Sequence, residues 1–187
     1  MSKLILVTGG SRSGKSSFAE SLCISRENST AYIATSTPFD EEMKDRVKKH
    51  KESRPSNWET YEIFKDIYSI IDNLGNKHQT VILDCVTLLV NNLIFDYGID
   101  FDKCTPEETN EMEKYIKQQI EMLINEIKKT DLYFVIVTNE LGMSLVPDNK
   151  LCRVYSDIVG RINQYIAKCA DEVYFVVSGI PMKIKEY

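Results

Sequence analysis

The chain lacks the sequence features of membrane, secreted and disulfide-stabilised proteins. Its 187 residues contain no apolar run near the ~18 residues that a transmembrane helix requires. The first residues pass from Lys3 into a short apolar run and then glycine, so we expect no signal peptide. The 5 cysteines are odd in number and none form a C-x-x-C pair. This disfavours a disulfide framework or a zinc site, and it favours free thiols in a reducing cytoplasm.

Basic residues are also too few for a general nucleic-acid-binding protein. The 23 Lys and Arg residues are outnumbered by 28 Asp and Glu residues, which gives a net charge of -5. A hydrophobic content of 43% and a charged content of 27% are ordinary for a globular protein. We find no internal repeat, low-complexity tract or linker, so we expect residues 1–187 to form a single domain.

Short apolar runs indicate the sheet. They are continuous rather than alternating, which is typical of strands that are buried on both faces of a parallel sheet. The five runs are Leu4–Val7, Ala31–Ile33, Val81–Leu83, Tyr133–Val137 and Val173–Val177. Helical segments fall between them, so the sequence predicts a layered α/β domain with a mostly parallel sheet and helices on both faces. Residues 179–185 could return as an antiparallel edge strand.

Two helices carry clear signals. Thr105-Pro106-Glu107-Glu108 is a capping box with proline at the first helical position. Helical spacing then continues through Met112, Ile116, Ile120, Leu123, Ile124 and Ile127. A second helix is expected from about Asn149 to Ala170, with its apolar stripe at Leu151, Val154, Tyr155, Ile158, Ile162, Tyr165, Ile166 and Cys169.

A phosphate-binding motif follows the first expected strand and precedes a helix. The pattern G-x-x-x-x-G-K-[ST] is matched by Gly9, Gly10, Ser11, Arg12, Ser13, Gly14, Lys15 and Ser16. Glycines allow the backbone to wrap a phosphate closely, and backbone amides at a helix N-terminus supply positive potential. Lys15 can reach the outer phosphates, and the Ser16 hydroxyl can bind Mg²⁺.

Polar residues end two other buried strands. Asp84 follows Val81-Ile82-Leu83 and is a candidate Mg²⁺ ligand beside the phosphate loop. The alternative is a carboxylate that caps the next turn. Thr138, Asn139 and Glu140 follow a third strand and could orient a water or a phosphate, or they could form a polar turn.

Only 2 histidines are present. His78 lies in a polar connection, where we expect a solvated loop residue. His50 follows a helix start at Thr37-Pro38, and helical geometry puts it on one side with Phe39, Met43, Arg46 and Val47. It is either a hydrogen-bonded core residue or a nucleophile that can form a phosphoramidate. In the second case Arg46, Lys49, Lys51 and Arg54 would offset phosphate charge, although some of these can simply be solvated.

These features together resemble a known family, the bifunctional adenosylcobinamide kinase/adenosylcobinamide-phosphate guanylyltransferases of cobalamin biosynthesis. The likeness runs in order along nearly the whole chain. It is carried by residues 8–16, 32–36, His50-Lys51 with Arg54-Pro55, 137–143 and 177–180. The phosphate loop alone is shared by many NTPases, whereas the combination with the His50 and Asn139 segments is much more specific.

The resemblance implies a single P-loop nucleotide-binding transferase domain over residues 1–187, with a RecA-like P-loop NTPase fold. Such an enzyme uses ATP or GTP to phosphorylate adenosylcobinamide, a corrinoid. It then transfers GMP from GTP through a guanylyl-histidine intermediate and releases pyrophosphate. The resemblance also implies a homotrimer. Mg²⁺ is expected from the phosphate loop itself, and a cytoplasmic location from the free thiols.

The same resemblance assigns residues. His50 and Lys15 are expected to be catalytic, and Ser16 and Asp84 to hold the metal. Besides the phosphate loop, the expected nucleotide-binding residues are Ala34, Thr35, Ser36, Lys51, Glu52, Ser53, Arg54, Glu62 and Asp84. A carboxylate such as Glu62 can accept hydrogen bonds from both N1–H and the 2-amino group of guanine, which adenine does not offer.

Two other functions remain open at this level. One is a P-loop small-molecule kinase without guanylyltransferase activity, in which His50 is structural. The other is a nucleotide-binding switch whose output is conformational. Labelling with GTP that carries the label at its α-phosphate separates the three.

Overall fold

The computed structural model describes residues 1–36, 54–143 and 145–186. The helix expected after Thr37-Pro38 lies outside these residues. The described strands are β1 (Lys3–Gly9), β2 (Thr30–Ala34), β3 (Glu59–Glu62), β4 (Thr80–Asp84), β5 (Tyr133–Val137), β6 (Glu172–Val177) and β7 (Ile180–Glu186). The helices are α1 (Lys15–Ile24), η1 (Ile67–Ile70), α3 (Ile71–Lys77), α4 (Val86–Tyr97), α5 (Pro106–Lys128) and α6 (Lys150–Cys169).

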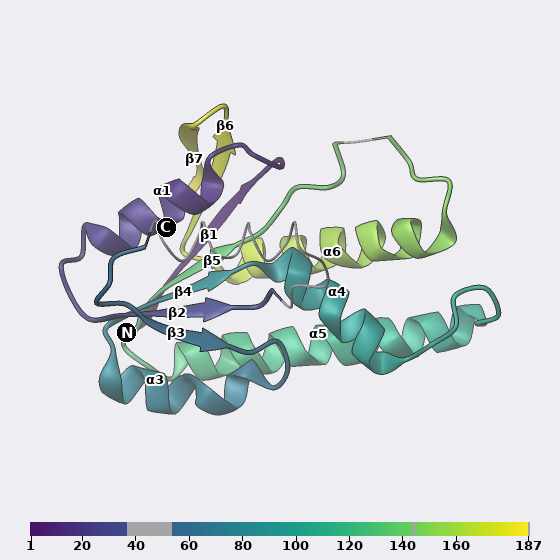
Figure 1. Ribbon diagram of the computed structural model, residues 1–187, viewed down its shortest axis with the longest axis horizontal. Coiled ribbons are helices and arrows are strands. Elements are labelled where there is room, and N and C mark those ends of the chain that lie inside the picture. Colours follow the sequence, from purple (N-terminus) through teal and green to yellow (C-terminus); the bar gives the residue numbers. More distant parts are fainter. Residues whose placement is uncertain (37–53, 144, 187) are drawn as a thin grey trace.

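The strands form one 7-stranded sheet with the order β3-β2-β4-β5-β1-β6-β7 (Figure 1). All neighbouring pairs are parallel except β6 and β7, which are antiparallel. The expected α/β fold with an antiparallel C-terminal edge strand is therefore confirmed. β5 lies between β1, which leads into the phosphate loop, and β4, which ends at Asp84.

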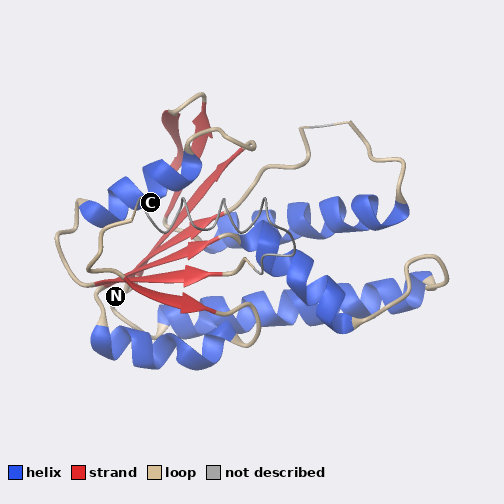
Figure 2. Cartoon of the chain, viewed as in Figure 1, coloured by secondary structure: helices blue, strands red, loops and turns tan. Residues whose placement is uncertain are grey.

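The two faces of the sheet are covered unequally. Alternate residues of each strand point to opposite faces, because the side-chain period of a strand is two. On one face α1 packs over a core that contains Ile5, Val7, Tyr32, Ile82 and Val135. On the other face α3, α4, α5 and α6 bury a larger core. Figure 2 shows α1 on one side of the strands and the longer helices on the other. None of the helices in the described ranges combines the length and the hydropathy needed to cross a bilayer.

Helix α5 agrees with its sequence signals. The Thr105 side chain accepts a hydrogen bond from the backbone N–H of Glu108, whose carboxylate accepts in turn from the Thr105 N–H. The six apolar residues expected to form its stripe are its buried residues. Helix α6 agrees less closely, because Val159 and Asn163 are buried but were not part of the expected stripe. Leu151, Val154 and Tyr155 are only partly buried against the core.

Two sequence-based predictions need correction. The edge strand β3 was not expected, because its sequence Glu59-Thr60-Tyr61-Glu62 has no apolar run. His78 is not a solvated loop residue: it is the C-cap residue that follows α3, and its side chain is only 9% exposed. Its Nε2 atom lies 3.2 Å from a Glu59 carboxylate oxygen. The edge strand therefore covers a histidine that the sequence places in a polar connection.

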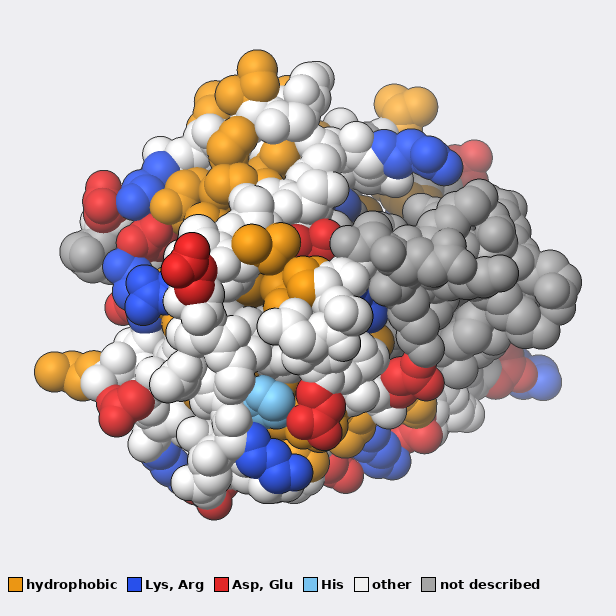
Figure 3. All heavy atoms as spheres, turned by 60° about the vertical axis from the view of Figure 1, so that its left-hand side comes forward, with side chains coloured by type: hydrophobic (Ala, Val, Ile, Leu, Met, Phe, Trp, Pro, Cys, Tyr) orange, Lys and Arg blue, Asp and Glu red, His pale blue; other side chains and the backbone are white. Residues whose placement is uncertain are grey.

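The β6–β7 hairpin turns through Ser178 and Gly179, whose φ angles are 51° and 81°. Positive φ at both central residues is the turn geometry that matches the twist of a hairpin. Beyond the turn, apolar side chains are exposed: Ile180 is 66% and Ile184 62% exposed. Figure 3 shows hydrophobic side chains gathered over this hairpin.

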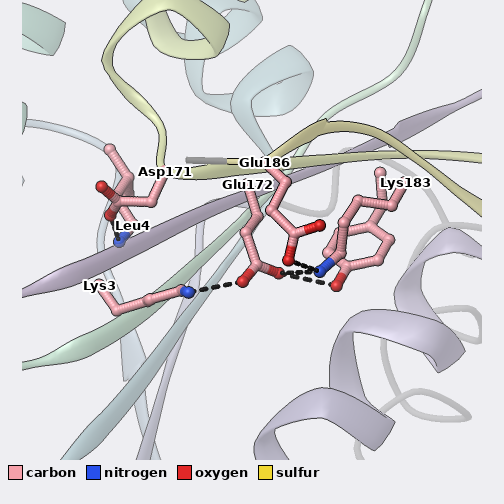
Figure 4. A network of polar contacts seen from close by, with 7 residues as sticks. Lys3, Leu4, Asp171, Glu172, Lys183 and Glu186 are labelled. Atoms are coloured by element: carbon pink, nitrogen blue, oxygen red, sulfur yellow. Dashed lines mark hydrogen bonds and ion pairs between the residues drawn. The ribbon is translucent and has the colours of Figure 1, made fainter.

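A network of charged residues fixes β1, β6 and β7 at the end of the sheet opposite the phosphate loop (Figure 4). The Lys3 ammonium lies 2.5 Å from one oxygen of Glu172, and the Lys183 ammonium lies 3.3 Å from the other. The Tyr174 hydroxyl also donates to Glu172, at 2.7 Å. The hydrogen bond from Lys3 is the main reason why the pKa of Glu172 falls to about 2.

Candidate nucleotide-binding site

The phosphate loop joins the end of β1 to the start of α1, as the motif requires. Gly14 is the residue before α1 and has a φ of 92°, which a residue with a side chain rarely adopts. A Cβ atom on Gly9 would lie 2.5 Å from the carbonyl oxygen of Val176, so only glycine fits there. The loop closes on itself through a hydrogen bond from the Ser13 N–H to the Gly10 carbonyl oxygen, at 3.2 Å.

Three polar side chains in residues 8–15 are buried, those of Thr8, Ser13 and Lys15. Lys15 is only 9% exposed, and its ammonium donates to the Gly10 carbonyl oxygen at 3.2 Å. The hydroxyl oxygens of Thr8 and Ser13 are buried without a hydrogen-bond partner among the described residues. Buried polar groups are normally paired, because an unpaired one costs free energy. Unsatisfied buried hydroxyls in a segment that also buries a lysine are therefore what a loop that receives an anion is expected to show.

Strand register brings several expected site residues to one edge of the sheet. Ala34 of β2 is paired with Glu62 of β3 on one side and with Asp84 of β4 on the other. Asp84 is aligned with Val137 of β5, which is aligned with Val7 of β1. Glu62 and the phosphate loop are thus separated by four strand spacings, roughly 19 Å.

Asp84 does not cap the following helix. Its carboxylate accepts a hydrogen bond from the Tyr32 hydroxyl at 2.9 Å. The residue before α4 is Cys85, which follows a cis peptide bond and makes no side-chain capping bond within the described structure. Asp84 is partly exposed at the strand end.

The donor set of Ser16 and Asp84 suits Mg²⁺. Both are oxygen donors, and Mg²⁺ binds one or two protein oxygens while keeping waters and substrate phosphates as its other ligands. Over residues 1–36, 54–143 and 145–186, no three His, Cys, Asp or Glu side chains converge to hold a metal ion. The fit is therefore to a metal that arrives with the nucleotide, not to a closed protein site.

Arg54 lies over the ring of Tyr32, with its guanidinium carbon 3.3 Å from the ring centroid. Its Nε and Nη1 atoms are buried and make no hydrogen bond to the described residues. Glu20 of α1 lies near both Arg54 and Asp84. The pKa of Glu20 is raised above its ordinary value, chiefly by burial. The Arg54 charge partly opposes this rise, and the Asp84 charge adds to it.

The polar groups of Thr35 make hydrogen bonds within the protein. Its hydroxyl donates to the Cys85 carbonyl oxygen at 2.8 Å and accepts from the Cys85 N–H at 2.9 Å. Its backbone N–H donates to the Asp84 carbonyl oxygen, and its own carbonyl accepts from Asn92. Thr35 thereby ties the end of β2 to the start of α4. Burial raises the pKa of the neighbouring Cys85 thiol to about 11.

The residues after β5 join a buried polar network rather than a simple turn. The Asn139 amide donates to the Thr87 hydroxyl at 2.8 Å, and the Thr138 hydroxyl donates to Asn163 at 2.7 Å. The Asn163 amide donates back to the Asn139 carbonyl oxygen at 3.0 Å. The Glu140 N–H donates to the Gly9 carbonyl oxygen at 3.1 Å, so this strand end is bonded to the phosphate loop.

Sequence inspection did not identify Thr87, Asn163, Glu20 or Tyr32 at the site. Asn163 offered one signal, since it is a polar residue within the apolar stripe of α6. The structure brings the phosphate loop, Ala34, Thr35, Arg54 and Asp84 to one region, with Glu62 on the outer strand of the same edge. His50, Lys51, Glu52 and Ser53 lie outside the described residues.

Comparison with known proteins is consistent with this geometry. The family model described as cobinamide kinase / cobinamide phosphate guanyltransferase matches residues 5–184. Two relatives are named bifunctional adenosylcobalamin biosynthesis protein CobU. The one from Escherichia coli K12 is 45% identical and the one from Salmonella typhimurium 44%, each covering 97% of this chain and 99% of the relative. CobP of Pseudomonas aeruginosa is 31% identical over 96% of both chains.

A solved structure supports the fold alone. The KaiC-like protein PH0186 of Pyrococcus horikoshii OT3 is similar with a TM-score of 0.51 and 13% identity, over 92% of this chain and 70% of that chain. The sequence relatives extend over almost the full length. The family model includes the phosphate loop and the strand-end row, which we define as the aligned residues Glu62, Ala34, Asp84 and Val137 at the ends of β3, β2, β4 and β5. The chain therefore belongs to the cobinamide kinase / cobinamide phosphate guanyltransferase family.

Proposed function

We propose that this protein phosphorylates adenosylcobinamide with a nucleoside triphosphate and then transfers GMP from GTP to the resulting phosphate. The observation that carries the proposal is the phosphate loop with its buried Lys15, in a chain that the family model matches over residues 5–184. The first reaction releases a nucleoside diphosphate, and the second yields adenosylcobinamide-GDP and pyrophosphate.

In the first reaction the corrinoid hydroxyl oxygen attacks the γ-phosphorus, and the bond from that phosphorus to the β-phosphate oxygen breaks. Lys15 and the backbone amides of residues 9–16 hold the outer phosphates and offset the charge that builds on them. Mg²⁺, held by the Ser16 hydroxyl and the Asp84 carboxylate, would supply further neutralisation of the phosphates. The remaining residues of the proposed nucleotide-binding site position the nucleotide.

In the second reaction a ring nitrogen of His50 attacks the α-phosphorus of GTP and releases pyrophosphate, which leaves a guanylyl group on the histidine. A phosphate oxygen of adenosylcobinamide phosphate then attacks the same phosphorus and breaks the phosphorus–nitrogen bond. We assign Lys51, Glu52, Ser53 and Arg54 to nucleotide binding, together with Ala34 and Ser36. Thr35, whose polar groups are bonded within the protein, contributes to the same segment by holding the end of β2 in place. Glu62 would accept from the guanine N1–H and 2-amino groups.

The strand-end row supports one nucleotide site that spans these residues. The ~19 Å from the phosphate loop to Glu62 is of the order of an extended nucleoside triphosphate. Ala34 and Asp84 lie between the two ends of that row. A triphosphate in the loop would thus direct its base across the ends of β5, β4 and β2.

The test is covalent labelling with GTP that is radioactive at the α-phosphate. We expect an acid-labile label on the wild-type protein and none on His50→Ala, with ATP-dependent cobinamide phosphorylation surviving at least partly. His78→Gln is the matched control because His78 is the only other histidine, and it should label normally. Labelling of His50→Ala would overturn the role of this residue. Phosphorylation without any label would indicate a kinase alone, and binding without turnover would indicate a switch.

Two further properties belong to the same proposal. We expect a cytoplasmic homotrimer, and the exposed apolar residues of the β6–β7 hairpin are consistent with self-association. The described cysteines Cys23, Cys85, Cys104, Cys152 and Cys169 are all free thiols, which suits a reducing compartment. Sedimentation equilibrium of the purified protein tests the trimer, and a monomer at all concentrations would refute it.

A further inference from the structure

Tyr32 contacts two proposed nucleotide-site residues through different parts of its side chain. It lies in the middle of β2 and is 2% exposed. Its hydroxyl donates to Asp84 at 2.9 Å, and the face of its ring carries the Arg54 guanidinium at 3.3 Å. Neither the family assignment nor the phosphate motif gives Tyr32 a role.

The hydroxyl contact follows from sheet register. Tyr32 is paired with Ile82, so Asp84 is its diagonal neighbour on the same face of the sheet. A hydrogen bond to an ionised carboxylate is among the stronger ones and is directional. The hydroxyl lies on the same face of the sheet as the Asp84 carboxylate and donates to one of its oxygens.

The ring contact acts on Arg54. A guanidinium over an aromatic face is attracted by the ring quadrupole, and this attraction is greater where water is excluded. The ring covers one face of the guanidinium plane, and the buried Nε and Nη1 atoms at its edge make no hydrogen bond within the described ranges. Glu20 lies close enough to interact electrostatically with both Arg54 and Asp84. The arginine is thus held by its face, while these two donors have no partner among the described residues.

We infer that Tyr32 is a positioning residue of the nucleotide site, which orients the Asp84 carboxylate through its hydroxyl and seats Arg54 on its ring. The inference rests on the proposed function, because that function gives Asp84 a metal ion to bind and Arg54 a nucleotide to bind. The two contacts make separate predictions. Loss of the hydroxyl should weaken the Mg²⁺-dependent part of nucleotide binding, which depends on Asp84. Loss of the ring should also weaken the binding without Mg²⁺, which depends on Arg54.

The experiment measures binding, so it does not depend on turnover. The probe is a GTP analogue with a methylene bridge between the α- and β-phosphates, which cannot donate its guanylyl group. Its dissociation constant is measured by calorimetry with Mg²⁺ and with EDTA. For Tyr32→Phe we expect the strengthening by Mg²⁺ to shrink about tenfold, the scale of a hydrogen bond to a charged group, with affinity in EDTA unchanged. For Tyr32→Leu we expect an additional loss of about fivefold in EDTA, the scale of an exposed to partly buried cation–π contact.

Tyr174→Phe is the matched control. Its hydroxyl also donates to a carboxylate, Glu172, but at the far end of the sheet. This variant should bind like the wild type in both conditions. The inference is overturned if Tyr32→Phe binds like the wild type with Mg²⁺, or if Tyr32→Phe and Tyr32→Leu bind equally in EDTA. It is also overturned if Mg²⁺ does not strengthen binding to the wild type.

Failure of this inference is distinguishable from failure of the proposed function. The guanylyl label on wild-type protein tests the function, and analogue binding by the variants tests Tyr32. A wild-type protein that labels normally while both variants bind normally would refute only the positioning role. A protein that binds the analogue as expected but never labels would refute the guanylyltransferase and leave the role of Tyr32 in nucleotide binding.

Discussion

The backbone N–H of Gly179 donates to the carbonyl oxygen of Ser13 at 2.8 Å. The turn of the β6–β7 hairpin is therefore bonded directly to the phosphate loop, although the two are far apart in the sequence. The approach is close at a second point, because a Cβ atom on Gly14 would lie 3.1 Å from the Cα atom of Gly179. The shape of the phosphate loop thus depends on the C-terminal hairpin as well as on its own glycines.

Gly14→Ala tests this packing. We expect a loss of about 2 kcal/mol in the free energy of unfolding, because alanine is strained at a φ of 92°. Affinity for GTP should also fall, since the added Cβ atom presses against the hairpin. Urea denaturation and calorimetry measure the two effects. The control is Gly98→Ala, at a φ of 80° with no described atom within 4 Å of the added carbon. It should lose stability alone, and an unchanged GTP affinity in Gly14→Ala would contradict the prediction.

Lys15→Met should impair both reactions. The substitution keeps most of the buried aliphatic chain but removes the ammonium that donates to the Gly10 carbonyl oxygen. Loss of one charge-stabilising group typically lowers kcat about 10²–10³-fold. Steady-state phosphorylation of cobinamide and the rate of guanylyl labelling are the measurements. Lys117→Met, which alters only an exposed ion pair with Glu121 on α5, serves as the control. Normal rates for Lys15→Met would show that this lysine does not contact the reacting phosphates.

Acid should remove the contribution of Glu172 to stability. Its pKa in the folded protein is about 2, lowered chiefly by Lys3, against an ordinary value of 4.5. A depressed folded pKa means that the stabilisation is complete above pH 4.5 and is lost as pH falls towards 2. We expect Glu172→Gln to cost about 2 kcal/mol in urea unfolding at pH 6.5, and clearly less at pH 3. A difference between the two proteins that stays constant over this range would be inconsistent with the depressed pKa.

The thiols should differ in reactivity. Burial raises the pKa of Cys23 to about 12 and that of Cys85 to about 11, whereas Cys152 is exposed on α6. Since the thiolate is the reactive form, iodoacetamide at pH 8 should alkylate Cys152 quickly. Cys23 and Cys85 should react only after denaturation. Mass spectrometry of peptides from native and urea-treated protein gives the comparison, and rapid native labelling of Cys85 would refute the prediction.

Local signals were sufficient where neighbouring residues decide the structure. The capping box at Thr105 and the stripe of α5 depend on interactions within one helix, and the structure reproduces both. The phosphate motif likewise sits between a strand and a helix, as its spacing requires. The sequence does not predict β3, because an edge strand can be polar. Its pairing with β2, and not its composition, makes this segment a strand.

The sequence by itself determined the parallel sheet, the phosphate loop and the two long helices, because continuous apolar runs, glycines and caps act over a few residues. Only the tertiary structure decided that Tyr32 bonds Asp84, that Arg54 lies on the same ring and that Gly179 closes on Ser13. These contacts join segments far apart along the chain, and strand order and register fix their separation. No local pattern encodes that order, since it results from the packing of the whole sheet.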